Sequence, residues 1–447
     1  MRDLLLISLV LAACLGALRH PWIGVMLWTW LSLMNPHRYT YGFAYDAPLA
    51  QMAVLATFVG LLMTRDRREL PLKGTPAGLF VLFIVWMTAS WLMGLDPGSD
   101  YEQWKKVMKI NLMLLVTIAV LNDKKHIMAL IWVSAGSLAL LGAKGGVFTI
   151  MTGGAYRVWG PPGSFVEDNN EFALALVMTI PLLRFLQLQL THKWGSRLMM
   201  VTMILRAGSA LGGHARGGLL AIISMALVLW WRGRSRIVGG VVILVAGVVM
   251  VSLMPAEWFQ RMETINTYQE DRSALGRFSA WWVAFGIGKS YLFGVGFSAA
   301  RSFLFEAYSP YGLEFGTPVA HSIYFQVMGH HGFIGLVIFL SIWVASYLWA
   351  GRIRKEAKGI PEARWCIDLA NMCQVSLVGY LVGGAFLSLA YFDLPYLIMV
   401  AVLLTRVWVR TKGWEREPVV VPSWRTIPGV IQPPGPGAAA PVRPGLP

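Results

Sequence analysis

The sequence predicts an all-α, polytopic integral membrane protein with about 12 transmembrane helices and one large folded periplasmic loop. Of its 447 residues, 56% are hydrophobic and only 14% are charged, whereas soluble domains carry about a quarter charged residues. The apolar residues form runs such as 77–95, 237–254 and 332–350. Each run is long enough to cross a hydrocarbon core of about 30 Å as a helix. The runs do not alternate as barrel strands would, so helices are the expected spanning elements.

The apolar runs divide the chain into four parts. Residues 1–254 are expected to form transmembrane helices 1–9, and residues 332–410 to form helices 10–12. Between them, residues 255–331 make a long loop in which aromatic residues recur at helical spacing, which predicts helices within the loop. Residues 411–447 end in a Pro- and Gly-rich stretch, which predicts a disordered cytoplasmic tail.

The first predicted span, residues 4–34, is broken near Pro21. Arg19 and His20 precede this proline, and each half of the segment, about 15 residues, is short for a full crossing. Counting the segment as one span gives twelve spans in all, and counting it as two gives thirteen. The sequence leaves both alternatives open.

The basic residues of the short loops predict the orientation. Nineteen Lys and Arg residues fall in one set of alternate short loops and five in the other set. The richer set is expected to be cytoplasmic, which places the long loop on the opposite, external side and, with twelve spans, both termini in the cytoplasm. This distribution accounts for the net charge of +15. Membrane lipids are therefore the expected partners, and nucleic acid is not.

One histidine motif closes the long loop. His321 and Ser322 are followed by nine residues and then by Gly332-Phe-Ile-Gly335, where an apolar run begins. An imidazole with a pKa near 6.5 can accept a proton from a hydroxyl group at neutral pH. The competing interpretation is that His321 only forms hydrogen bonds within the loop. His330 and His331 lack the pattern and are expected to be packing or interface residues.

This motif and its place in the predicted topology resemble the O-antigen ligase family and its relatives. The resemblance implies an inverting, metal-independent glycosyltransferase of lipopolysaccharide biosynthesis, with its active site facing the periplasm. The donor would be an undecaprenyl-pyrophosphate-linked glycan and the acceptor a sugar hydroxyl of lipid A-core. His321 would be the catalytic residue, and no cofactor is implied. Two alternatives lie within the same superfamily, an O-antigen polymerase and a protein O-oligosaccharyltransferase. A membrane transporter is an alternative from another class, but the internal repeats typical of transporters are not evident.

Two arginines match positions at which this family carries arginine. Arg216 lies between two predicted spans and precedes two glycines, and Arg277 precedes Trp281. The resemblance implies that both bind the pyrophosphate, for which the guanidinium fork is well suited. The family often has a hydroxyl residue before the first of these arginines, whereas this chain has Ala215. The competing interpretation for Arg216 is an interfacial arginine that binds any lipid phosphate.

Four further residues are weaker candidates for substrate binding. His214 and Arg272 lie in the same external segments as Arg216 and Arg277, whereas Arg157 and Asn170 lie in another external loop between two predicted spans. Asn170 stands close to the start of a predicted helix, where a helix cap is the ordinary explanation. The external loops contain no Asp-x-Asp motif, so no metal site is expected.

Overall fold

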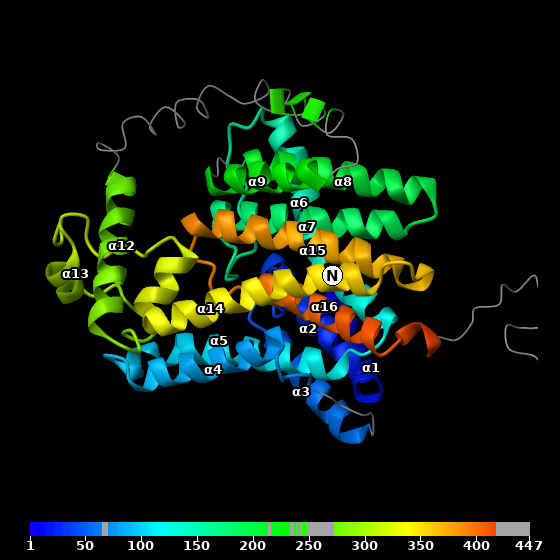
Figure 1. Cartoon of the computed structure of the whole chain (residues 1–447), viewed down its shortest axis with the longest axis horizontal. Coiled ribbons are helices and arrows are strands. Elements are labelled where there is room, and N and C mark those ends of the chain that lie inside the picture. The colour runs from blue at the N-terminus through cyan, green and yellow to red at the C-terminus, as the bar shows by residue number, and fades with distance from the viewer. Residues whose placement is uncertain are drawn as a thin grey trace, which may run out of the picture.

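The structure, a computed structural model, describes residues 1–64, 70–212, 216–232 and 272–416, together with a few residues between 237 and 248. Every regular element within these ranges is helical (Figure 1), as the sequence predicts. The principal helices are α1 (Arg2–Arg19), α2 (Pro21–Met34), α3 (Leu49–Met63), α4 (Pro76–Leu92), α5 (Pro97–Val120), α6 (Lys124–Met151), α7 (Asn169–Gln189), α8 (Lys193–Gly212), α9 (Arg216–Arg232), α12 (Arg272–Ser290), α13 (Ser302–Tyr308), α14 (Ile323–Glu356), α15 (Arg364–Gly383) and α16 (Asp393–Arg410).

Four helical segments of the described chain are long and apolar enough to cross a membrane. They are α6, α7, α14 and the segment Pro361–Phe386, which contains α15. Shorter apolar helices of 10–17 residues accompany them, among them α2, α3 and α4. The length and composition of these helices are those of a membrane protein. The total of about twelve spans stays a prediction.

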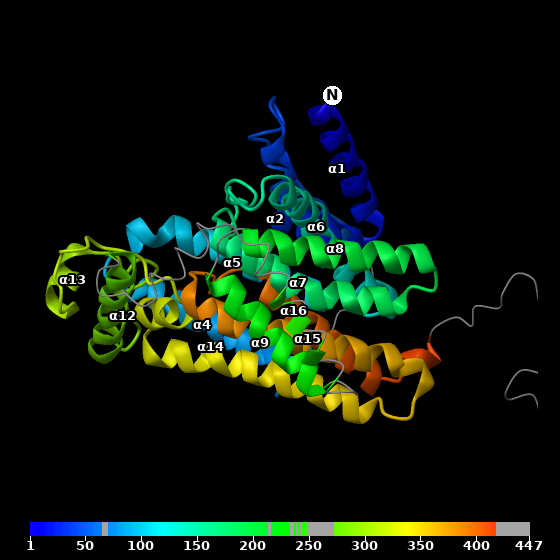
Figure 2. The same ribbon diagram turned by 90° about the horizontal axis from the view of Figure 1, so that it is seen from above.

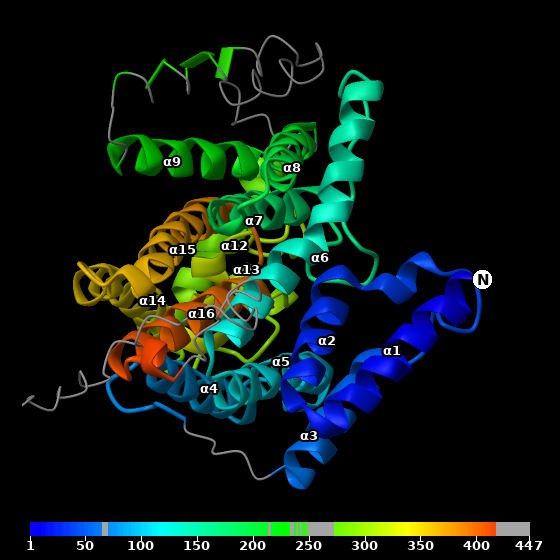
Figure 3. The ribbon, with the colours of Figure 1, turned by 90° about the vertical axis from the view of Figure 1, so that its right-hand side faces the viewer.

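The interruption at Pro21 separates two helices. α1 ends at Arg19 and α2 begins at Pro21, where a proline is tolerated because the first helical N–H has no partner within the helix. The two helices pack against each other and against α3 (Figure 3). Asp3 Oδ1 accepts hydrogen bonds from the backbone N–H groups of Gly42 and Ala44, both at 3.1 Å. The chain therefore doubles back, and its first residues lie beside the segment that follows α2.

The centre of the bundle is formed by helices that are buried on nearly all sides. Most residues of α7 and nearly all residues of α16 are buried, as expected of a helix that is apolar around its whole circumference. α7 packs against α8 and α15, and α14 packs against α4, α15 and α16 (Figure 2). These contacts bring the start of α7 and the start of α14 to the same region of the molecule.

Two helices of the described chain, α12 and α13, lie within the segment that the sequence predicts to be a long loop. α12 and α13 lie at one end of the bundle, and the connections from α7 to α8 and from α14 to α15 lie at the other end (Figure 1). Residues 255–271 of this loop and residues 417–447 of the predicted tail lie outside the described residues.

Helix α14 begins nine residues before the apolar run predicted from residue 332. Gly332 interrupts it with φ of 69° and ψ of −176°, a conformation that residues with a side chain rarely adopt. A Cβ atom on Gly332 would lie 2.4 Å from the carbonyl oxygen of Leu292. The kink therefore lets the backbone after α12 approach α14 closely, and the predicted boundary of the apolar run falls on it.

Candidate functional site

The segment that ends in His321 is held against α12 and α14. The indole Nε1 of Trp281, on α12, donates a hydrogen bond of 2.7 Å to the carbonyl of Ala320. The same indole stacks on the ring of Phe325, with centroids 4.9 Å apart and planes 9° apart. Trp281 thus fixes the chain on both sides of His321. His321 itself has φ of 42°, a conformation that is rare outside glycine and must be stabilised by its surroundings.

Charged groups from two other helices surround His321. Asp168 precedes α7, and its Oδ1 accepts hydrogen bonds from the backbone N–H of Asn170 at 2.9 Å and from the Asn170 side chain at 3.0 Å. The side chain of Glu171 is also hydrogen-bonded to Asp168. Electrostatic interactions join His321 to both Asp168 and Arg277, and Arg277 also interacts with Glu171. The long loop and the start of α7 therefore form one cluster.

The surroundings of His321 favour its neutral form. Burial lowers the pKa of the His321 imidazole below its ordinary value of 6.5, and the positive charge of Arg277 lowers it further, while Asp168 opposes the shift. Burial acts to raise the pKa of Asp168, but hydrogen bonds from Asn170 and Glu171 and the nearby His321 hold it below its ordinary value. At neutral pH the cluster therefore places an unprotonated imidazole beside an ionised carboxylate.

A pocket of about 290 Å³ opens beside His321. We call it the arginine pocket, and it is lined by Arg272, Ser273, Gly276, Arg277, Phe315, Pro318 and His321. The guanidinium of Arg272 lies 5.6 Å from the ring centroid of Phe315 and donates a hydrogen bond of 3.3 Å to the carbonyl of Glu314. Two guanidinium groups at one pocket are the arrangement that recognises phosphate oxygens. Arg272, a weaker candidate from the sequence, thus lines the same pocket as Arg277 and His321.

The start of α9, which carries the candidate Arg216, lies at the same end of the bundle as His321. Arg216 is the first residue of α9, and the described structure gives the course of its backbone. The next residue, Gly217, faces the carbonyl of Gly383, and Gly384 packs against Ile323 at the start of α14. The start of α9 is thus at the same end of the bundle as His321.

Two candidates are not joined to this cluster. His214 lies outside the described residues. Arg157 is exposed, and the part of the chain that the structure describes shows no ion pair or hydrogen bond between it and the cluster around His321. Asn170 is the second residue of α7, and the helix cap is Asp168, which accepts the backbone N–H of Asn170. The side chain of Asn170 also donates to Asp168 at 3.0 Å, which places it next to the cluster.

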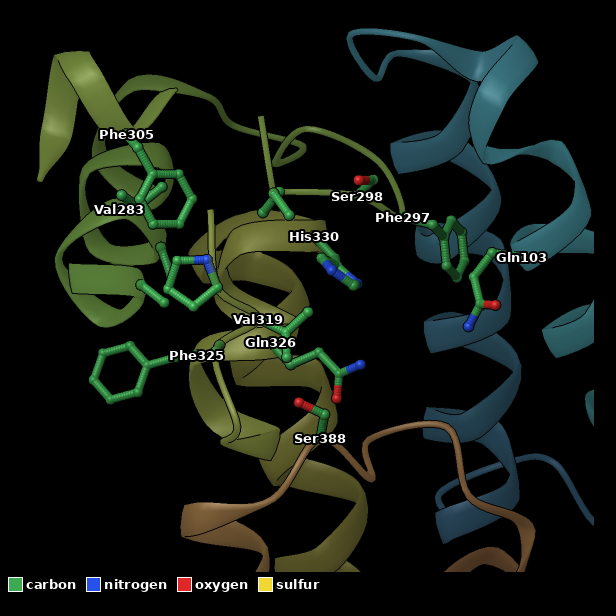
Figure 4. A pocket seen from close by; sticks show the side chains of 16 residues that line it. Gln103, Val283, Phe297, Ser298, Phe305, Val319, Phe325, Gln326, His330 and Ser388 are labelled. Carbon is green, nitrogen blue, oxygen red and sulfur yellow. The ribbon is translucent and has the colours of Figure 1, made fainter. Parts of the chain in front are cut away.

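Figure 4 shows a second pocket, which has a volume of about 200 Å³. We call it the polar pocket, because five neutral polar side chains are among its lining residues: Gln103, Ser298, Gln326, His330 and Ser388. Pro318 lines both pockets. His330 is therefore more than the packing residue that its position in the sequence indicates. His331 is fully buried, which agrees with a packing role.

The turn that carries Ser298 is held by the first half of the chain. The carboxylate of Asp100, on α5, accepts the backbone N–H of Phe297 at 2.7 Å and lies 3.7 Å from the guanidinium of Arg301. On its other side, the turn donates hydrogen bonds from Val295 and Gly296 to the carbonyls of Gly329 and His330, at 3.2 and 3.1 Å. The two glycines of this turn, Gly294 and Gly296, therefore have a structural role. A Cβ atom on Gly294 would lie 2.4 Å from the backbone carbonyl oxygen of His330, on α14.

Sequence reasoning missed several members of this region. Asp168 and Glu171 are acidic residues at the start of an apolar run, and this position could have marked them as candidates. Carboxylates near a helix start are usually helix caps, however, so the sequence alone did not select them. Their relation to Arg277 depends on tertiary contacts between segments about 100 residues apart. Asp100 carries no local signal of its contact with Phe297. The described residues include no group of three or more His, Cys, Asp or Glu side chains arranged to hold a metal ion.

Comparison with known families divides the chain into two regions. Residues 1–191 match a family model described only as a family of unknown function. Residues 198–340 match the model of the O-antigen ligase family, and this region contains Arg216, Arg272, Arg277 and His321. None of the curated proteins compared with the chain matches it. Over residues 198–340 the chain is thus similar to the O-antigen ligase family, and its apolar helices have the length and composition of membrane-spanning helices.

Proposed function

We propose that this protein is an O-antigen ligase, which transfers a glycan from undecaprenyl pyrophosphate to a sugar hydroxyl of lipid A-core at the periplasmic face of the inner membrane. The observation that carries the proposal is the placement of His321 and two arginines at one pocket. A transfer of this kind needs a base for the acceptor hydroxyl and positive charge for the leaving pyrophosphate. The cluster supplies both.

The proposed reaction is a direct displacement. The acceptor hydroxyl oxygen forms a bond to the anomeric carbon of the donor glycan, while the bond from that carbon to the pyrophosphate oxygen breaks. His321 takes the proton of the attacking hydroxyl. Arg277 and Arg272 bind the pyrophosphate that leaves with the lipid, and Arg216 is proposed to join them. Inversion at the anomeric carbon follows from a single displacement.

The acidic residues of the cluster have a supporting role. Asp168 lies close enough to His321 to interact with its charge, so it would stabilise the imidazolium that forms when the proton arrives. The pyrophosphate is a good leaving group, and most of the rate increase should therefore come from positioning and charge stabilisation. His321 would contribute the rate increase that is usual for a general base, about 10²–10⁴-fold.

The arrangement of the helix ends supports the proposed orientation. α14 ends at Glu356 and is followed by the basic segment that contains Lys358, and this end of α14 is opposite to α12 and α13 (Figure 1). Basic segments favour the cytoplasmic side. The arginine pocket, to which α12 contributes Arg277, would then face the periplasm.

The test is transfer by the purified full-length chain in detergent, with an undecaprenyl-pyrophosphate-linked glycan as donor. Lipid A-core, the non-reducing end of a second glycan and an acceptor protein are offered as alternative acceptors, because they separate ligase, polymerase and protein glycosylation. His321→Ala should lower the rate by about 10²–10⁴-fold and leave binding of undecaprenyl pyrophosphate unchanged.

Two comparisons sharpen this test. Arg277→Ala should weaken binding of undecaprenyl pyrophosphate, and Arg277→Lys should restore it only in part, because a point charge does not replace the guanidinium fork. His192→Ala is the matched control, since His192 is exposed in the connection between α7 and α8 and should leave the rate unchanged. Near-normal transfer by His321→Ala would refute the proposal.

A further inference from the structure

The polar pocket has the chemistry of a sugar site and lacks that of a phosphate site. Its lining includes the carboxamides of Gln103 and Gln326 and the hydroxyls of Ser298 and Ser388, but no lysine or arginine. Neutral donors and acceptors of this kind match the hydroxyl groups of a carbohydrate. The adjoining arginine pocket has the opposite character. The two pockets therefore differ in charge, although Pro318 lines both.

Three polar groups of this pocket have hydrogen-bonding capacity that the described residues do not use. The Oγ of Ser388 is buried and has no hydrogen-bond partner among the described residues. The side-chain oxygen of Gln326 accepts the backbone N–H of Ala390 at 3.2 Å, which leaves its NH₂ group to donate. His330 is bound through Nδ1 to the hydroxyl of Tyr391 at 2.8 Å, which leaves its Nε2. A buried polar group without a partner costs about 1–3 kcal/mol, and a bound hydroxyl would remove that cost at Ser388.

The pocket is built to hold these groups in place. Its polar side chains come from four separate segments: α5, the turn after α12, α14 and the segment before α16 (Figure 4). The Tyr391 hydroxyl that binds His330 also binds Nε2 of His331 at 2.7 Å. The rest of the lining, which is the larger part of it, is apolar and includes the rings of Phe297 and Phe325. Polar edges combined with aromatic rings suit the edges and the faces of a pyranose ring.

We propose that the polar pocket seats one pyranose ring of the acceptor glycan, next to the hydroxyl that attacks the donor. Its volume of about 200 Å³ is below the ~300–1,000 Å³ of pockets for drug-sized ligands, so it takes a single ring. The acceptor is favoured over the donor's lipid end because the pocket lacks cations and because the segment through Pro318 separates it from the arginine pocket. This inference rests on the proposed function and adds a specificity site to it.

The experiment uses the full-length chain in detergent and two variants of the pocket. Ser388→Val replaces a buried hydroxyl by a methyl group and adds a second methyl group on Cβ. Gln103→Leu removes a carboxamide from α5. Each should raise KM for lipid A-core by about three- to tenfold, the worth of one hydrogen bond. Affinity for undecaprenyl pyrophosphate should stay that of the unmodified protein. Ser302→Val, at the exposed start of α13, is the control and should change neither quantity.

A second measurement keeps this inference separate from the proposed function. Binding of a free lipid A-core oligosaccharide is followed by saturation-transfer NMR with no donor present. A weaker signal in Ser388→Val but not in Ser302→Val supports the pocket even if no transfer is found, in which case only the proposed function fails. An unchanged signal and an unchanged acceptor KM in both pocket variants would overturn the inference. A rise in KM for the donor glycan instead would overturn the assignment to the acceptor.

Discussion

Replacing Trp281 by phenylalanine isolates one hydrogen bond that positions His321. The variant keeps an aromatic ring to stack on Phe325 but removes the Nε1–H that binds the carbonyl of Ala320 at 2.7 Å. A hydrogen bond of this kind stabilises by about 0.5–1.5 kcal/mol. The positive φ of His321 costs about 1–3 kcal/mol, an energy of the same size. The lost bond should therefore let the segment relax and lower the population of the active conformation.

The expected result is a fall of about tenfold in the rate of transfer, since about 1.4 kcal/mol corresponds to a factor of ten. The melting temperature should change little, because the ring contact is kept. Trp282→Phe is the matched control: it removes an indole N–H from the next residue of α12, whose side chain is 54% exposed, and it should retain full activity.

A double-mutant cycle decides whether the effect passes through His321. If Trp281 acts by positioning this residue, Trp281→Phe should have almost no further effect in a His321→Ala background. The assay is single-turnover transfer with purified protein, which reports the chemical step. An equal tenfold loss in both backgrounds, or full activity of Trp281→Phe, would refute the reasoning.

Three further predictions follow from the charges and the topology. Because Asp168 raises the pKa of His321 and Arg277 lowers it, Asp168→Asn should shift the acidic limb of the pH–rate profile to lower pH and Arg277→Gln to higher pH. In the unmodified protein the rate should fall on the acid side of the ordinary imidazole pKa of about 6.5, where the imidazole gains its proton. Shifts in the same direction would contradict the electrostatic assignment. A single cysteine at Val319 should react with an impermeant thiol reagent in intact cells and one at Lys355 should not, and the reverse pattern would invert the proposed orientation. Transfer should persist in EDTA, because the arginines are assigned the charge stabilisation; loss on chelation that magnesium restores would reveal a metal requirement.

Much of the fold was predictable because membrane helices carry their signal locally. The apolar runs locate most of the described helices, and the proline at residue 21 marks the real interruption between α1 and α2. The start of α14 was not predictable from hydropathy, because residues 323–331 include Gln326, His330 and other polar side chains. The structure explains their presence: two of them line the polar pocket.

The candidate site was predictable in part. His321 and Arg277 belong to sequence motifs, so the sequence alone could select them as site residues. Arg272 could be named as a candidate because it lies in the same segment as Arg277. Asp168 and Trp281 were not assigned a role, because their roles depend on contacts between segments far apart in the sequence. Asp168 reaches His321 across more than 150 positions, and the bond from Trp281 to Ala320 spans 39. Such partners appear only when the bundle is assembled.

The contacts of Asp100 and Asp168 have a consequence for how this protein can change over time. Both carboxylates belong to the region that matches a family of unknown function, and the groups that they contact lie in the O-antigen ligase region. Neither region holds the complete arrangement by itself. In a chimaera that joins residues 1–191 of this chain to the later region of another protein that matches the O-antigen ligase family model, the grafted part must present a backbone N–H to Asp100 and a histidine to Asp168. The two halves are thus expected to be inherited together, and recombination near residue 195 should yield active proteins only between close relatives.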